Sequence, residues 1–176
     1  MRAIAHSLDT ISAALNRLAL YGAVASVLVL VLAASWQVIA RYILAQPPVW
    51  TEELARYMMV WAGLLGASVA FRAHADPSLF PAARELSDSL GRIFAVFRAL
   101  GVLGFIAPIL WFSAFSLRGD FSGGYIARQS RQMAEAMDVP MVVFATAVPA
   151  GFFLIFLHAL AHLTNTFVTN SEDASS

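Results

Sequence analysis

Long apolar runs alternate with short polar segments along this chain. In three places the sequence continues for 19 residues or more without a charged side chain. A helix needs about 20 residues to cross the hydrocarbon layer of a membrane, which is about 30 Å thick. These runs therefore predict transmembrane helices over residues 18–40, 98–117 and 139–162.

A fourth apolar run is shorter, and its length decides where its helix begins. Only 15 residues separate Arg56 from Arg72, which corresponds to about 22 Å of helix. A helix that starts at Trp50 and includes Phe71 has 22 residues and is about 33 Å long. We therefore expect a span over residues 50–71 that carries charges in its first turns, at the membrane surface.

Two segments beside the spans have the periodicity of amphipathic helices. Apolar residues in the N-terminal segment recur at intervals of three and four: Ile4, Leu8, Ile11 and Leu15. Residues 79–97 repeat the pattern, with Pro81 suited to a first helical turn. Both patterns predict helices lying in the membrane interface, over 1–17 and 79–97. For the first, a soluble helix on a partner is the alternative.

The remaining connections are polar or contain helix breakers. Residues 118–138 include the turn signal Ser122-Gly123-Gly124, followed by a possible short helix from Tyr125 to Met137. Prolines at positions 108 and 149 predict kinks in the third and fourth spans. Residues 165–176 are expected to form a flexible C-terminal tail.

Composition agrees with a membrane location. Apolar residues make up 60% of the chain and charged residues 12%, and the mean hydropathy is +0.72. Soluble domains are about 45–50% apolar and about 25% charged. We therefore expect an all-α integral membrane protein whose four transmembrane helices form one domain over residues 18–164.

The residue types that are absent exclude several activities. The chain has no cysteine and no lysine, which excludes thiolate chemistry, Schiff bases and a P-loop. Its net charge is zero, so nothing indicates nucleic-acid binding, and no G-x-S-x-G motif is present. We expect neither an enzyme nor a bound cofactor. The first span contains no charged residue and the third contains none after Arg98 at its start, although an ion pathway normally needs one within the membrane. The chain is therefore expected to be a subunit that transports nothing by itself.

His158 and His162 leave one alternative open. They are four residues apart, so they share a helix face, as a pair of metal ligands would. The alternative function is therefore a histidine-ligated membrane cytochrome or metal-binding subunit. The competing interpretation is a polar cap at the end of the fourth span.

The start of the second span concentrates the remaining charges. Thr51 is a candidate N-cap, and Glu52 and Glu53 then fall in the first turn, where they complement the helix dipole. Glu52 and Arg56 have the favourable i, i+4 order. We expect Glu52 or Glu53 to pair with Arg56 or with Arg41, which ends the first span, so the charges serve architecture rather than catalysis.

Two further features of this helix favour a structural role. Trp50 and Trp61 are placed as interfacial anchors. The small residues Ala62, Gly66 and Ala70 recur every four positions and predict a face on which another helix packs closely.

These residues resemble a known family. The pattern is similar to the signature of the small permease subunit of TRAP (tripartite ATP-independent periplasmic) transporters, the DctQ-like family. That signature has an arginine that ends the first span, then W-x-E-E-x-A-R, a tryptophan, a glycine-containing span and a following histidine. The matching residues are Arg41, Trp50, Glu52, Glu53, Ala55, Arg56, Trp61, Gly66 and His74. The resemblance extends over about residues 15 to 162.

The resemblance implies a role and a set of partners. Such subunits are static scaffolds for a large, sodium-coupled permease that moves like an elevator, and a periplasmic binding protein delivers the solute, often an organic acid anion. The resemblance also implies a bacterial inner membrane location with both termini in the cytoplasm. Arginine counting alone does not decide the orientation, because six lie on one side and five on the other.

Overall fold

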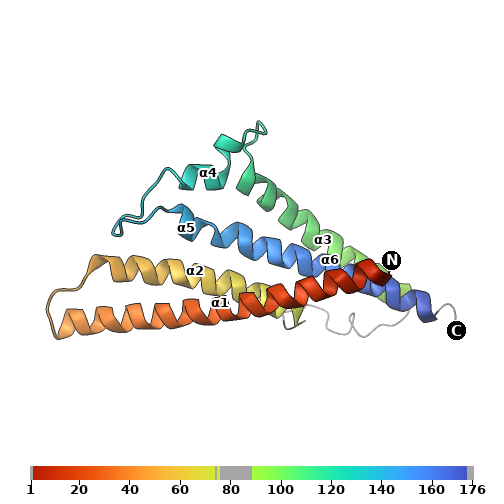
Figure 1. Cartoon of the computed structure of the whole chain (residues 1–176), viewed down its shortest axis with the longest axis horizontal. Helices are drawn as coiled ribbons and strands as arrows, with labels where there is room; N and C mark the ends of the chain where they lie inside the picture. Colours follow the sequence, from red (N-terminus) through yellow and green to blue (C-terminus); the bar gives the residue numbers. More distant parts are fainter. Residues whose placement is uncertain (1, 74, 76–88, 174–176) are drawn as a thin grey trace.

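The computed structural model describes residues 2–73, 75 and 89–173 of the chain. The long helices are α1 (Arg2–Tyr42), α2 (Val49–Arg72), α3 (Ser89–Ala114) and α6 (Ala147–Asp173), and the short ones are η2 (Phe121–Gly123), α4 (Tyr125–Gln129) and α5 (Val142–Ala145) (Figure 1). Four segments are long and apolar enough to cross a membrane: His6–Tyr42, Val49–Arg72, Val96–Ala114 and Val142–Thr164. The predicted all-α membrane fold is confirmed.

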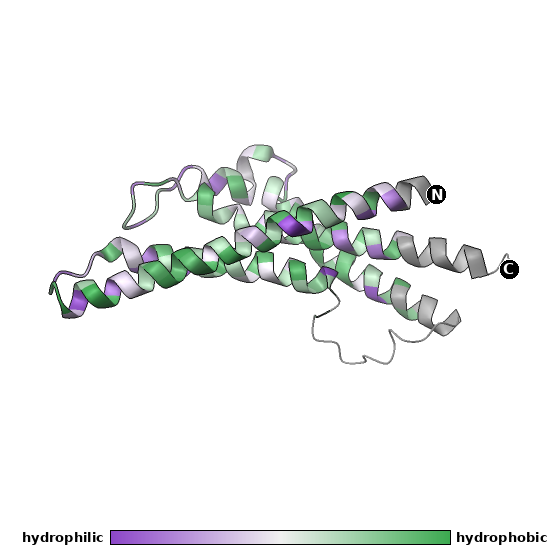
Figure 2. Ribbon diagram, turned by 60° about the horizontal axis from the view of Figure 1, so that its bottom comes forward, coloured by the Kyte–Doolittle hydropathy of each residue, from purple (hydrophilic) through white to green (hydrophobic). Residues whose placement is uncertain are grey.

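Helices α1, α2 and α6 pack against one another, whereas α3 packs against α6 and α4. Figure 1 shows the N- and C-terminal ends of the chain at the same end of the molecule. In Figure 2, hydrophobic colouring dominates the long helices, and the most hydrophilic residues lie mainly toward their ends and in the α3–α5 connection.

Small residues set the helix spacing. A Cβ atom on Gly22 of α1 would lie 2.8 Å from Leu65 Cδ1, and one on Gly151 of α6 would lie 2.7 Å from Leu64 Cβ. Alanines supply most of the buried apolar side chains, among them Ala147, which is fully buried. Without a hydrophobic driving force between helices in lipid, close backbone approach of this kind provides the packing energy.

The N-terminal segment differs from the prediction. Residues 2–17 continue into the first span without a break, so α1 has 41 residues and is about 62 Å long, about twice the hydrocarbon thickness. No glycine or proline occurs before Gly22 to interrupt it. Polar side chains of this segment bind α2 and α6, which holds it against the bundle.

The third and fourth spans also have other limits than predicted. Helix α3 begins at Ser89 and passes through Pro108. Residues 89–97 of the predicted interfacial helix therefore lead directly into the span. Residues 79–88 and His74 lie outside the described residues. The fourth span is divided at Thr146 into α5 and α6. Pro149 explains the division, because it has no N–H to bind the carbonyl of Ala145 and its ring clashes with that group.

The expected tail is helical for most of its length, because α6 continues to Asp173. The possible helix after Gly124 is short instead, and α4 ends at Gln129. The amide groups of Glu135 and Ala136, which a longer helix would use, are bound to a side chain of α2.

Candidate functional site

The first turn of α2 is the first of two polar sites. The helix begins at Val49, directly after Pro48, so Thr51 is inside the helix and is not the N-cap. Its hydroxyl is fully buried and donates to the Pro48 carbonyl at 2.8 Å. This early start gives the span its length and brings the next residues of the turn against the α4–α5 connection.

Glu53 binds that connection directly. Its Oε1 accepts hydrogen bonds from the Tyr57 hydroxyl at 2.7 Å and the Glu135 N–H at 2.8 Å, and its Oε2 accepts one from the Ala136 N–H at 2.7 Å. Only 5% of Glu53 is exposed. Hydrogen bonds to a carboxylate are stronger than those between neutral groups, so Glu53 holds two neighbouring amides of a distant segment.

The bound segment is itself ordered by backbone hydrogen bonds. Met133 and Pro140 form an isolated antiparallel bridge. The Ala134 N–H donates to the Val139 carbonyl at 2.9 Å. The ring of Tyr57 stacks on Phe144 of α5 with 4.2 Å between centroids. Glu53 and Tyr57 thus fix both the loop and the start of the fourth span to α2, and we call this pair the loop clamp.

The other charges of the motif are less constrained. Arg56 and Glu52 are 3.9 Å apart, with 66% and 63% of their side chains exposed, and such exposed pairs contribute little. Arg41 is exposed near the end of α1, and Glu53 takes its hydrogen bonds from Tyr57 and the two amides rather than from either arginine. The sequence pattern points to this turn, but no local pattern connects Glu53 with residues about eighty positions away.

The predicted aromatic anchors and the small-residue face of α2 are only partly buried within this chain. Trp50 is 43% exposed, and Trp61 is half-buried. Ala62, Gly66 and Ala70 are also half-buried, and a Cβ on Gly66 would meet no atom within 4 Å. Within this chain the close contacts of α2 instead use Leu64 and Leu65.

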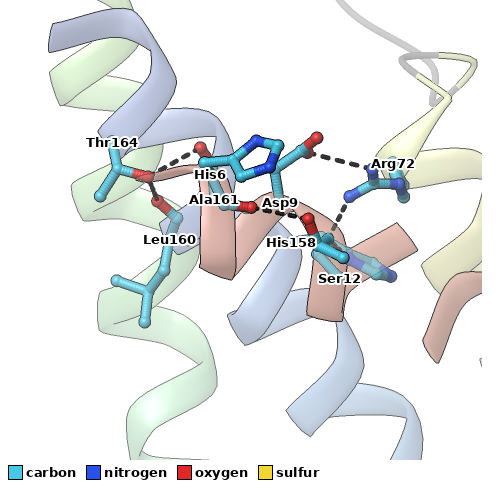
Figure 3. A network of polar contacts seen from close by, with 9 residues as sticks. His6, Asp9, Ser12, Arg72, His158, Leu160, Ala161 and Thr164 are labelled. Carbon is cyan, nitrogen blue, oxygen red and sulfur yellow. Dashed lines mark hydrogen bonds and ion pairs between the residues drawn. The ribbon is translucent and has the colours of Figure 1, made fainter. Parts of the chain in front are cut away.

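A second polar site joins three helices at the opposite end of the bundle (Figure 3). Arg72, the last residue of α2, donates from Nη2 to Asp9 Oδ1 of α1 at 3.1 Å and from Nη1 to Ser12 Oγ. Ser12 Oγ lies 2.7 Å from Nδ1 of His158 on α6. Ser12 and His158 are fully buried. We call these four residues the three-helix network.

We assign the proton positions on His158 from the hydrogen bonds around its ring. The Ser12 hydroxyl accepts from Arg72, whose guanidinium can only donate, and we assign the serine hydrogen to the bond with Nδ1. Nε2 then carries the ring hydrogen, and this buried atom has no hydrogen-bond partner in the described structure. His158 is therefore a cross-link between helices rather than a polar cap at a helix end.

His162 occupies a different position. Its ring lies 6.0 Å from that of Phe71. No group of three or more histidine, aspartate or glutamate side chains in the described residues is arranged to hold a metal ion. The spacing along the chain points to His158 but not to its partners, because the pattern of residues 1–17, which include Asp9 and Ser12, predicts an interfacial helix.

The fold and these sites define a class: a polytopic helical membrane protein whose buried polar groups connect its own helices. One family model, described as "Tripartite ATP-independent periplasmic transporters, DctQ component", matches residues 30–169. The chain therefore belongs to the DctQ family, the small membrane subunits of TRAP transporters. No curated protein matches the chain.

Proposed function

We propose that this chain is a non-catalytic scaffold for the large permease subunit of a sodium-coupled TRAP transporter. In this proposal the large subunit holds the substrate and sodium sites, and a periplasmic binding protein delivers an organic acid or a similar solute. The chain lies in the bacterial inner membrane with both termini in the cytoplasm. The loop clamp is then periplasmic, and the three-helix network is cytoplasmic.

One observation supports the scaffold role above the others: Glu53 and His158, the buried ionisable side chains among the described residues, bind within the chain. Glu53 binds Tyr57 and two backbone amides, and Arg72, Ser12, Asp9 and His158 bind one another. Ion pathways are marked by intramembrane ionisable groups that face a cavity. Here such groups stabilise one arrangement of helices, which is what a static subunit requires.

Copurification tests the partner. The chain, carrying an affinity tag, is expressed together with the large membrane protein encoded beside it and extracted in mild detergent. We expect both proteins to elute together in a constant ratio, whereas an unrelated membrane protein of similar size does not bind. Elution of the tagged chain alone, while the large protein stays folded, would contradict the proposal.

A further inference from the structure

Residues of α3, η2, α4 and α6 line a crevice. It lies at the end of the molecule where α3 and α6 diverge (Figure 1). Its volume is about 290 Å³. Apolar side chains supply most of its lining: Leu110, Ala114, Phe121, Ile126, Ala127 and Pro149. Two serines complete it, but each hydroxyl donates to a carbonyl of its own segment, Ser113 to Ile109 at 2.7 Å and Ser130 to Ala127 at 2.9 Å. Water therefore finds few partners in this crevice.

The roof of the crevice is fixed in place. A Cβ atom on Gly124 would lie 2.2 Å from the Ala114 carbonyl oxygen, so only glycine allows the α4 segment to approach the end of α3 this closely. Aromatic rings continue along the rim: Trp111 and Phe115 stack, and Phe115 and Phe121 meet edge to face, each pair with 4.7 Å between centroids. Aromatic side chains are enriched at the level of lipid headgroups.

Three arginines lie in or beside the segment that forms this roof. Arg118, Arg128 and Arg131 are all exposed, and none forms an ion pair with a carboxylate in the part of the chain that the structure describes. Arg131 Nη2 lies 3.4 Å from the Ser122 carbonyl oxygen, which places its guanidinium beside Phe121 at the rim. Asp120 is the one carboxylate between residues 118 and 131, so this segment has an excess of positive charge; Glu135 and Asp138 follow it in the α4–α5 connection.

We propose that the crevice binds an anionic phospholipid, with an acyl chain between α3 and α6 and the phosphate held by Arg131. The apolar lining is complementary to the acyl chain, and the Arg131 guanidinium, which has no carboxylate partner among the described residues, is complementary to the phosphate. An apolar partner helix would use the same lining but would leave this cation without a counter-charge. The lipid explains both halves of the site.

Lipid retention measures this binding. The full-length protein is purified from membranes containing phosphatidylglycerol and phosphatidylethanolamine, and bound lipids are counted by native mass spectrometry. We expect phosphatidylglycerol to be retained selectively, and Arg131→Gln to weaken its retention about fivefold, the effect of one cation near an anionic lipid. Arg41→Gln, at an exposed arginine away from the crevice, is the matched control and should change nothing.

A second variant tests the acyl-chain half separately. Ala127→Phe fills the crevice and should displace the lipid while the arginines remain. Equal retention in the Arg41→Gln control and the Arg131→Gln variant, or full retention in Ala127→Phe, would overturn the proposal. A protein occupant would overturn it as well: the chain has no cysteine of its own, so a cross-link from Ala127→Cys to another protein would identify such an occupant.

Discussion

The environments of Glu52 and Glu53 differ although the two residues are neighbours of the same type. Glu53 is 5% exposed and accepts three hydrogen bonds, whereas Glu52 has a single long contact with Arg56 at the surface. Glu52 is thus a control for measuring how much the hydrogen bonds of Glu53 stabilise the protein.

Glu53→Gln should lower the thermal unfolding temperature by several degrees. The glutamine loses the negative charge, and its amide group brings donors toward backbone N–H groups that need acceptors. Glu52→Gln should leave the unfolding temperature almost unchanged, because exposed pairs contribute little. Unfolding of both variants in detergent, followed by circular dichroism, makes the comparison. Equal effects of the two substitutions would show that the loop clamp is not stabilising.

Ser12→Ala should destabilise the protein by about 1–3 kcal/mol, because it removes the partner of Arg72 Nη1 and of the buried His158 Nδ1. Ser35→Ala, at an exposed serine of the same helix, should stay within about 0.5 kcal/mol of the parent. Denaturant unfolding in micelles measures both free energies. A Ser12→Ala protein as stable as the control would show that the three-helix network does not stabilise the protein.

At the scale of elements, the sequence predicted helix type and approximate position better than helix ends. Charge-free runs were sufficient for the spans because a membrane imposes their length. The sequence predicted a helix boundary at residue 17, whereas α1 is continuous there. The contacts that hold residues 2–17 against the bundle come from Arg72 and His158, far along the chain, so no local pattern shows them. The short α4 has a similar cause, because Glu53 takes amides that a longer helix would have used.

Gly151→Ala tests the packing of α6 on α2. The added methyl group would lie 2.7 Å from Leu64 Cβ, so we expect a loss of about 1–3 kcal/mol. Gly101→Ala in α3 makes the same chemical change where no atom lies within 4 Å. It should be neutral or stabilising by up to about 1 kcal/mol through helix propensity. Comparable losses at both positions would mean that α2 and α6 are not closely packed.

At the scale of the whole molecule, the two polar sites fasten opposite ends of one arrangement. The loop clamp joins α2 to the α4–α5 connection, and the three-helix network joins α1, α2 and α6. Family membership could be anticipated from the motif around Glu52 and Glu53, because that motif is continuous in sequence. The three-helix network could not, because its four residues come from three separate helices.

The scaffold role predicts that transport requires the large subunit. The decisive measurement is sodium-driven solute uptake into proteoliposomes, with the binding protein and a candidate organic acid supplied outside. We expect uptake when this chain and the large permease are reconstituted together, and none from this chain alone. Solute uptake by the purified chain alone would contradict the proposal that this chain is a non-catalytic scaffold.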